Sequence, residues 1–406
     1  MSVQIDAPIE VVPTAAPDDS VAAVSGAIES IASHLHPVAS YDLAAHPRPN
    51  GREEVWRFTP LKRLRGLLED GAASGTVDVA VEAPDGVTVS TISAADARAL
   101  GGPAPVDRIA ALAAANADQV TLVDVAAEAS LDATVVVTVT GSGAERAFGN
   151  LVVRVGAFAK AIVVLEHRGS AVYAGNTTLL VGDGASVEFA GLQLWEDDAV
   201  HGGQTSIVVG RDAEVRTISA SLGGDLVRLV ETAEYSGAGG SVEQLGLYFV
   251  DAGQHIEHRL FVDHNAPKTR SNVDYRGALQ GEGAHSVWVG DVLIRKVAEG
   301  IETYESNKNL VLTDGCRADS VPNLEIETGN IAGAGHASTT GRFDDEQLFY
   351  LRSRGIDEAE ARRLVVHGFF ADIIRRIGVP RVEQRLLEAV EAELAVNVGL
   401  PTSSAV

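Results

Sequence analysis

Cysteine is almost absent from this chain: the 406-residue sequence contains one, Cys316. A single thiol excludes an internal disulfide and a CxxC metal motif, and it suits a reducing compartment, so we expect a cytoplasmic protein. The first residues lack the basic start and apolar core of a signal peptide. The best candidate for a long apolar run, residues 151–167, is interrupted by Arg154 and Lys160. A membrane-spanning helix, which needs about 18 consecutive apolar residues, is therefore not predicted.

Basic residues are scarce relative to acidic ones: 32 Lys and Arg face 56 Asp and Glu, which gives a formal net charge of −24. A chain this acidic repels the phosphates of nucleic acids and of anionic membranes, so we expect neither as a partner. The acidity by itself indicates no more than solubility. Aromatic residues make up only 5%, whereas glycine occurs 41 times. Together with frequent valine and alanine, this composition indicates many short strands joined by tight turns.

From about residue 132 to 334, short apolar runs alternate with turns that contain glycine. Three of these turns resemble one another at spacings of 28 and 27 residues: GDGASV (182–187), GRDAEV (210–215) and GAGGSV (237–242). A repeat of this length is typical of a stacked solenoid, in which each turn of the chain buries its apolar side against the next. The pattern favours a parallel β-helix. An ordinary β-sandwich with accidental spacing is the alternative that periodicity alone leaves open.

Helical patterns flank the strand-rich region. Apolar positions recur at helical spacing in residues 24–35, and a further helix is predicted with Pro60 in its first turn. After residue 342 we expect three helices, the first of them opened by a capping arrangement of Asp344 and Gln347. The predicted organisation is a disordered tail (1–20), a mainly helical domain (21–130), a β-helix core (131–341), a helical domain (342–396) and a frayed tail (397–406).

The sequence lacks the motifs of several common enzyme classes. It has no Walker A loop for ATP, no GxSxG nucleophile elbow and no HExxH zinc helix. Its GxG pair, Gly182 and Gly184, lies between strand-like runs, where turn glycines are expected, so a dinucleotide fingerprint is not predicted. We therefore expect a chain that is not an enzyme by itself.

The candidates for metal chemistry are histidines and the single cysteine. His336 lies among small residues (IAGAGHASTTGR) where the β-rich region meets the C-terminal helices, so another chain can approach it, and a neutral imidazole suits iron. A surface or structural histidine is the alternative. His255 and His258 are three residues apart in a strand-like segment and should point to opposite faces, which disfavours a shared metal. His264 is expected to form hydrogen bonds in a turn. Cys316 is either a further ligand or a small buried side chain.

A series of motifs runs in order along the chain. These are WRFTP (56–60), HRLFVDHNAPKTRS (258–271), YRGAL (275–279), NKNLVL (307–312), PNLEI (322–326) and GHASTTGRFDDEQLFYLRSRGI (335–356). They resemble the SufB/SufD family of scaffold subunits of the SUF iron–sulfur cluster assembly system, and the last resembles the family's C-terminal signature. The resemblance is close over residues 250–375 and looser elsewhere.

Within this family the details resemble SufD more than SufB. SufB chains carry a sulfur-accepting cysteine in a Cys-Asp-Ser stretch, whereas the equivalent region here reads NKNLVL and Cys316 follows in a turn. Many SufD relatives have Cys-Ser-His before Gly-Ala-Thr, whereas this sequence has Ala334, Gly335 and His336. The histidine kept without the cysteine indicates that the imidazole carries the role, and it weakens any role of this chain as a sulfur acceptor.

The resemblance implies a right-handed parallel β-helix between helical ends. It implies pairing with SufB through the β-helices and docking of the ABC-type ATPase SufC, which hydrolyses the ATP, through the C-terminal helices. A transient iron–sulfur cluster then forms at the SufB interface, and no cofactor is bound stably. His336 matches the interface histidine, with Cys316 and Glu325 as further candidate ligands. The residues expected to dock the ATPase are Asp344, Gln347, Tyr350, Arg354 and Gly355. The isolated chain is expected to form a homodimer.

Two other functions fit a β-solenoid. A carbohydrate-active β-helix enzyme needs clustered carboxylates on a cleft and is usually secreted, whereas the acidic residues here are scattered among turns. A purely structural interaction scaffold would share the fold and the partners. It would differ only in that His336 would be dispensable.

Overall fold

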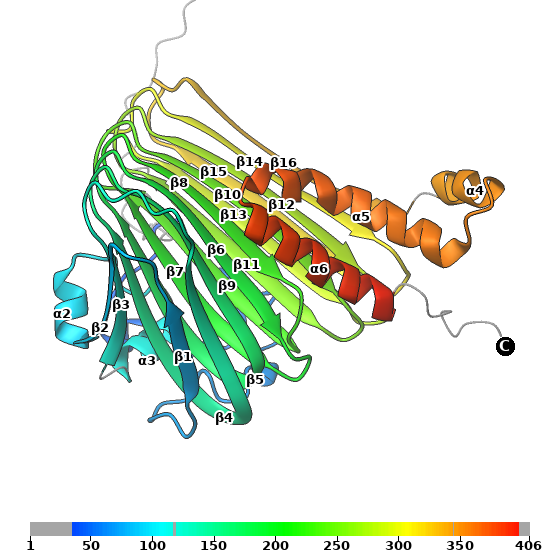
Figure 1. Cartoon of the computed structure of the whole chain (residues 1–406), viewed down its shortest axis with the longest axis horizontal. Coiled ribbons are helices and arrows are strands. Elements are labelled where there is room, and N and C mark those ends of the chain that lie inside the picture. The colour runs from blue at the N-terminus through cyan, green and yellow to red at the C-terminus, as the bar shows by residue number, and fades with distance from the viewer. Residues whose placement is uncertain (1–34, 117–118, 344, 398–406) are drawn as a thin grey trace, which may run out of the picture.

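A parallel β-solenoid forms the body of the computed structural model, which describes residues 35–116, 119–343 and 345–397 (Figure 1). Short helices precede the solenoid in the chain and longer ones follow it. The mainly β architecture predicted from the repeat is therefore confirmed. The helix predicted at 24–35 and the two predicted tails lie outside the described residues, except for Leu35 and Asn397.

The solenoid has two walls, and the chain alternates between them. Two long strands, β4 (Val135–Val155) and β5 (Lys160–Val181), start the solenoid; the first half of β5 pairs with β6 and its second half with β7. The even wall continues with β6 (Ser186–Trp195), β8 (Glu214–Ser221), β10 (Ser241–Val250), β12 (Arg270–Leu279), β14 (Glu302–Val311) and β16 (Gly333–Arg342). The odd wall continues with β7 (Val200–Val209), β9 (Leu226–Tyr235), β11 (His255–His264), β13 (His285–Ile294) and β15 (Arg317–Ile326).

The three similar turns recognised in the sequence stack at one corner of the solenoid, where each leads into a strand of the even wall. A Cβ atom at Gly210 would lie 2.6 Å from the carbonyl carbon of Gly182 in the preceding turn, so these corners need glycine. Along the walls the strands pair in register, as Ser241 with Arg270 and Arg270 with Glu302. Because of this register, residues one turn of the chain apart, here called one rung, stack in columns.

The N-terminal segment packs on the outside of the odd wall. Its elements are η1 (Leu43–Ala45), η2 (Glu54–Trp56), η3 (Leu61–Leu64), β1 (Val77–Glu82), β2 (Val87–Ser93), α2 (Ala94–Ala99), α3 (Arg108–Ala115) and β3 (Gln119–Val125). Trp56, Leu64 and Leu67 are buried in one cluster with Val200 of β7 and Leu226 of β9. This apolar contact holds the segment against the solenoid.

The helix predicted after Pro60 is shorter than expected. The chain forms only the 3-10 helix η3 there, because Arg65 (φ 45°) and Gly66 (φ 90°) adopt left-handed conformations and end it. The Arg63 and Arg65 guanidiniums reach the Asp225 carboxylate at 2.7 and 2.8 Å. These contacts with the solenoid override the local helical preference.

Three helices follow the last strand: α4 (Asp345–Ser353), α5 (Glu358–Ile377) and α6 (Pro380–Asn397). The Asp357 side chain caps α5, which ends at Gly378 (φ 74°), and Pro380 starts α6, where its missing N–H costs nothing. The pair α5 and α6 covers the outside of the even wall (Figure 1). Apolar side chains of the two helices and of β6, β8 and β10 form one buried cluster there. Among the described residues, no helix is long and apolar enough to cross a membrane.

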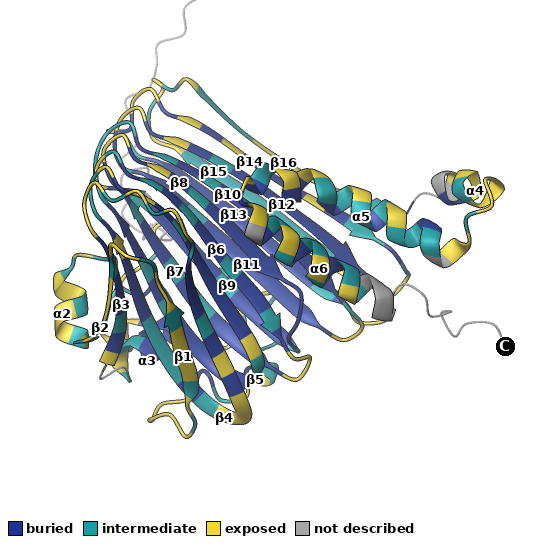
Figure 2. Ribbon diagram, in the orientation of Figure 1, coloured by how far each residue is buried: buried dark blue, intermediate teal, exposed yellow. Residues whose placement is uncertain are grey.

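The solenoid ends at β15 and β16, and this end is open. These two strands terminate the strand order, each of them with a ladder on one side. Nearly every residue of β13 is buried, whereas β15 is mostly half-buried and β16 half-buried or exposed (Figure 2). Pro322 in the middle of β15 fits an edge strand, because proline cannot donate to a second ladder. The open end therefore presents a pair of strand edges to a partner.

Candidate functional site

His336 lies at this open end, on the last strand of the even wall. In the register of β14 and β16 it stacks on Glu305, and its Nδ1 is 3.8 Å from Glu305 Oε1. The His336 side chain is 44% exposed, whereas that of Glu305 is 2% exposed. The pair thus joins a solvent-facing imidazole to a carboxyl group in the interior of the solenoid.

The Glu305 carboxyl is unusual because neither of its buried oxygens has a hydrogen bond in the described part of the chain. Burial, and then the neighbouring Asp291 carboxyl, raise the pKa of Glu305 to about 8. A buried carboxyl without donors favours its neutral form, so Glu305 holds a proton at neutral pH. A cation bound by His336 would favour loss of this proton, because metal ligands must be deprotonated. One imidazole and one carboxylate suit ferrous iron, but other ligands must come from elsewhere.

Cys316 and Glu325, the other predicted ligands, lie far apart. Cys316 directly precedes β15 and Glu325 is near its other end; nine residues of strand span about 30 Å, so the two cannot share one ion. The Cys316 sulfur is 3.4 Å from the Gly281 carbonyl oxygen in the preceding turn, and burial raises the pKa of its thiol. Glu325 accepts a hydrogen bond from His36 at 3.0 Å, and Glu327 lies beside them. Both residues remain predictions as ligands of a cluster.

The residues expected to dock the ATPase gather on α4, which projects away from the solenoid (Figure 1). Tyr350 is 56% exposed, and its neighbour Phe349 is 75% exposed. The Arg354 guanidinium lies over the Tyr350 ring at 5.0 Å, and Gly355 (φ 86°) turns the chain toward α5. Asp344 lies outside the described residues and the side chain of Gln347 is not described. Two exposed aromatic rings on one short helix make α4 a candidate surface for a partner.

The histidines of the HIEH segment point to opposite faces, as predicted. His258 lies inside the solenoid, where it stacks between Tyr248 and Tyr275 with ring centroids 5.5 and 5.4 Å away, and burial lowers its pKa to about 4. His255 lies outside, beneath the N-terminal segment. His264 bonds to Thr269 and Ser271 at 2.7 and 2.9 Å, which confirms its predicted hydrogen-bonding role.

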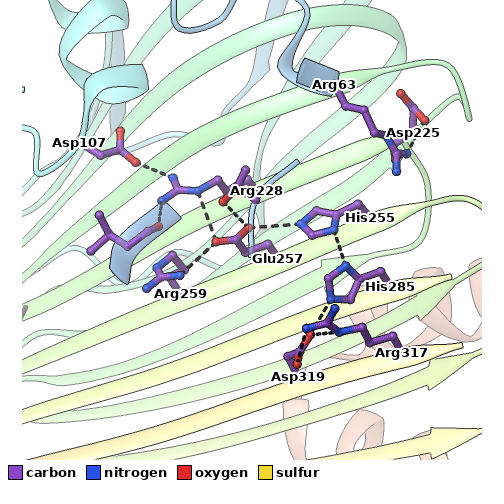
Figure 3. Close-up of polar contacts among 12 residues, drawn as sticks. Arg63, Asp107, Asp225, Arg228, His255, Glu257, Arg259, His285, Arg317 and Asp319 are labelled. Carbon is purple, nitrogen blue, oxygen red and sulfur yellow. Dashed lines mark hydrogen bonds and ion pairs between the residues drawn. The ribbon is translucent and has the colours of Figure 1, made fainter. Parts of the chain in front are cut away.

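A buried ionic network joins the outside of the odd wall to the N-terminal segment (Figure 3). Arg228 on β9 lies between Asp107 (2.6 Å) and Glu257 (3.4 Å), and its guanidinium covers the Trp56 ring at 3.9 Å. Burial alone would raise the pKa of Glu257, but Arg228, His255 and Arg259 outweigh it and hold that pKa well below its usual range. The network therefore keeps fully buried charges paired, and it fixes the segment to the solenoid.

Comparison with known proteins decides the family. The family model "SUF system FeS cluster assembly, SufBD core domain" matches residues 116–369, which is more than half of the chain. An iron–sulfur cluster assembly SufBD family protein of Mycobacterium bovis is 51% identical over 383 residues, covering 92% of this chain and 96% of that protein. One from Mycobacterium leprae is 48% identical over 375 residues, covering 90% and 95%. The chain belongs to the SufBD family.

A SufD-named relative is also similar to this SufBD chain, though over a shorter stretch. The iron–sulfur cluster assembly protein SufD of Bacillus subtilis is 34% identical over 113 residues, which are 28% of this chain and 26% of that protein. The SufBD core match begins just before β3 and ends within α5, so it contains the whole solenoid and His336. Family membership in iron–sulfur cluster assembly, inferred from the motifs, is thereby confirmed.

Sequence reasoning missed two features of this SufBD chain. Glu305 was not selected, although it precedes His336 by 31 residues, which is about the length of one rung. The contact between His255 and His285, which are 30 residues apart, was missed for the same reason. Applying the rung length to every candidate residue would have found both contacts.

Proposed function

We propose that this chain is a SufD-type scaffold subunit of a SUF iron–sulfur cluster assembly complex. Its open solenoid end pairs with a SufB-type subunit, and its C-terminal helices dock a SufC-type ABC ATPase, which hydrolyses the ATP. A nascent cluster forms transiently at the interface of the two solenoids, with His336 as one ligand. The chain itself contributes no catalysis. A single thiol and cluster chemistry both fit the reducing cytoplasm as the site of assembly.

The observation that carries this proposal is the position of His336 at the open end. Strand edges recruit other strands, so β15 and β16 suit a second β-solenoid, and they suit a second copy of this chain when the partner is absent. His336 stands on this surface above the unpaired carboxyl of Glu305. One imidazole and one carboxyl cannot complete the ligand set of a cluster, so the missing ligands would come from the partner.

Partner binding is tested by co-expression with SufB-type and SufC-type proteins, with an affinity tag on this chain alone. The proposal predicts one complex of all three on size exclusion. Deletion of the C-terminal helices is a poor test of SufC docking, because α5 and α6 cover an apolar wall that would then be exposed. The double substitution of Phe349 and Tyr350 by alanine is sharper, because both side chains are exposed. It should release the ATPase and keep the SufB-type subunit.

The role of His336 is tested by His336→Ala, which should fold and assemble but lose cluster maturation in an anaerobic reconstitution. Ser338→Ala is the matched control, because Ser338 is an exposed neighbour on the same face of β16 and offers no nitrogen ligand. Normal cluster yield from the His336→Ala complex would leave a purely structural scaffold as the function. A chain that purifies alone, indifferent to both partners, would contradict the whole proposal.

A further inference from the structure

A second pair of histidines lies on the outside of the odd wall, away from His336. His255 is the first residue of β11 and His285 the first of β13, and the register of the two strands places one directly beside the other. Their rings meet edge to face with centroids 4.8 Å apart, and the two Nδ1 atoms are 3.2 Å apart (Figure 3). This contact is independent of the function proposed above.

The other nitrogen of each ring faces a carboxylate. His255 Nε2 lies 3.3 Å from Glu257 Oε2, and His285 Nε2 lies 2.7 Å from Asp319 Oδ2. Both carboxylates also pair with arginines, Glu257 with Arg259 at 3.2 Å and Asp319 with Arg317 at 2.7 Å. Arginines keep the carboxylates ionised, and ionised carboxylates only accept hydrogen bonds. Each Nε2 must therefore carry the hydrogen.

This assignment leaves two lone pairs facing each other. A neutral imidazole with its hydrogen on Nε2 has a bare Nδ1, so His255 and His285 present two acceptors at 3.2 Å. Such a contact is repulsive unless a cation lies between the rings. The cation is either a proton or a metal ion.

The distance between the nitrogens favours a metal ion. A shared proton would form a charge-assisted hydrogen bond, which draws the donor and acceptor to about 2.7–2.9 Å. Two nitrogens bonded at about 2.0–2.1 Å to a tetrahedral ion lie roughly 3.3 Å apart. The observed 3.2 Å is closer to the second value. Carboxylates that hold the far Nε2–H of each imidazole are also the usual outer partners of metal-binding histidines.

We propose that His255 and His285 form a binding site for one divalent transition-metal ion of the kind that imidazole prefers, such as zinc or cobalt. Glu257 and Asp319 orient the two rings from behind. His255 is buried, but His285 is 20% exposed, so the ion has access from solvent and keeps water as its remaining ligands. The ion bridges two neighbouring rungs next to the contact of Arg63 with Asp225 and so stabilises the solenoid there.

The experiment titrates the full-length chain with zinc by calorimetry and with cobalt by visible absorption, and follows the melting temperature in parallel. The wild type should bind one zinc ion at this site and melt at a higher temperature with it. His285→Ala should lose both effects; it is preferred to a change at His255 because His285 is partly exposed. Asp319→Asn keeps both ligands and should weaken zinc about 10–100-fold, as loss of an outer partner typically does.

His36→Ala is the control, because His36, Glu325 and Glu327 form another group that could hold an ion. This variant should leave the site at His255 and His285 unchanged. Zinc binding that survives in His285→Ala and disappears in His36→Ala would overturn the proposal. A wild type that ignores both metals would also overturn it and leave a shared proton as the cation between the rings.

Discussion

Replacement of Arg228 by methionine should detach the N-terminal segment from the solenoid. The Arg228 side chain is 2% exposed, and its charge faces Asp107 (8% exposed) and Glu257 (0% exposed). Methionine keeps much of the apolar volume but leaves two buried carboxylates without this partner. Removal of one partner from a buried ion pair costs about 3–5 kcal/mol. Because Arg259 still pairs with Glu257 at 3.2 Å, we expect a loss near the lower end, about 3 kcal/mol.

The assay should report on the segment itself, because a solenoid does not unfold as one unit. Trp56 lies under the Arg228 guanidinium and is one of three tryptophans, so its fluorescence during a urea titration follows detachment of the segment. A loss of about 3 kcal/mol raises the opening constant roughly a hundredfold.

Two further variants make this test decisive. Arg270→Met is the matched control, because Arg270 is 72% exposed and 3.9 Å from Glu302, so its loss should change the free energy by less than about 0.5 kcal/mol. Adding Glu257→Gln to Arg228→Met should restore part of the stability, because it removes a buried charge. The reasoning is refuted if Arg228→Met destabilises the segment no more than the control does.

Three other outcomes follow from the structure. The depressed pKa of Glu257 means that its ionised form contributes stability above the ordinary glutamate pKa of about 4.3, and that this contribution is lost as the pH falls. The difference in free energy of unfolding between wild type and Glu257→Gln should thus be constant from pH 6 to 8 and shrink below about pH 4; a gap that widens on acidification would contradict the assignment. Gly277→Ala should destabilise the solenoid by about 1–3 kcal/mol in denaturant titrations, because a Cβ there would lie 1.9 Å from Cε2 of the buried Tyr248 ring. Gly143→Ala, where a Cβ meets nothing within 4 Å, should change stability little, and equal losses at both positions would show that the Tyr248 ring moves freely.

The solenoid could be predicted because its repeat is written locally in the sequence. Each rung needs a close-packed corner, and the similar turns at 182–187, 210–215 and 237–242 mark those corners at regular intervals. The helix caps around Asp357, Gly378 and Pro380 are equally local, and the structure forms helices between them. Such features depend on neighbours in the chain, which a single sequence displays.

Contacts between rungs could not be predicted, because they depend on the register of strands about 30 residues apart. Glu305 reaches His336, and His255 reaches His285, only because each strand pairs with the one a rung earlier. The helix expected after Pro60 failed for a similar reason. Its arginines bind Asp225, 160 or more residues away, and this tertiary contact outweighs the local propensity.

The central claim is that the open end formed by β15 and β16 binds a SufB-type subunit. Hydrogen exchange measured on this chain alone and in complex with that subunit tests it most directly. We predict new protection in residues 317–342, which form the two edge strands, and little change in the outer strands β1 and β2 at the other end. Protection on the helix-covered outside of the even wall, with residues 317–342 still exchanging as in the free chain, would contradict the account.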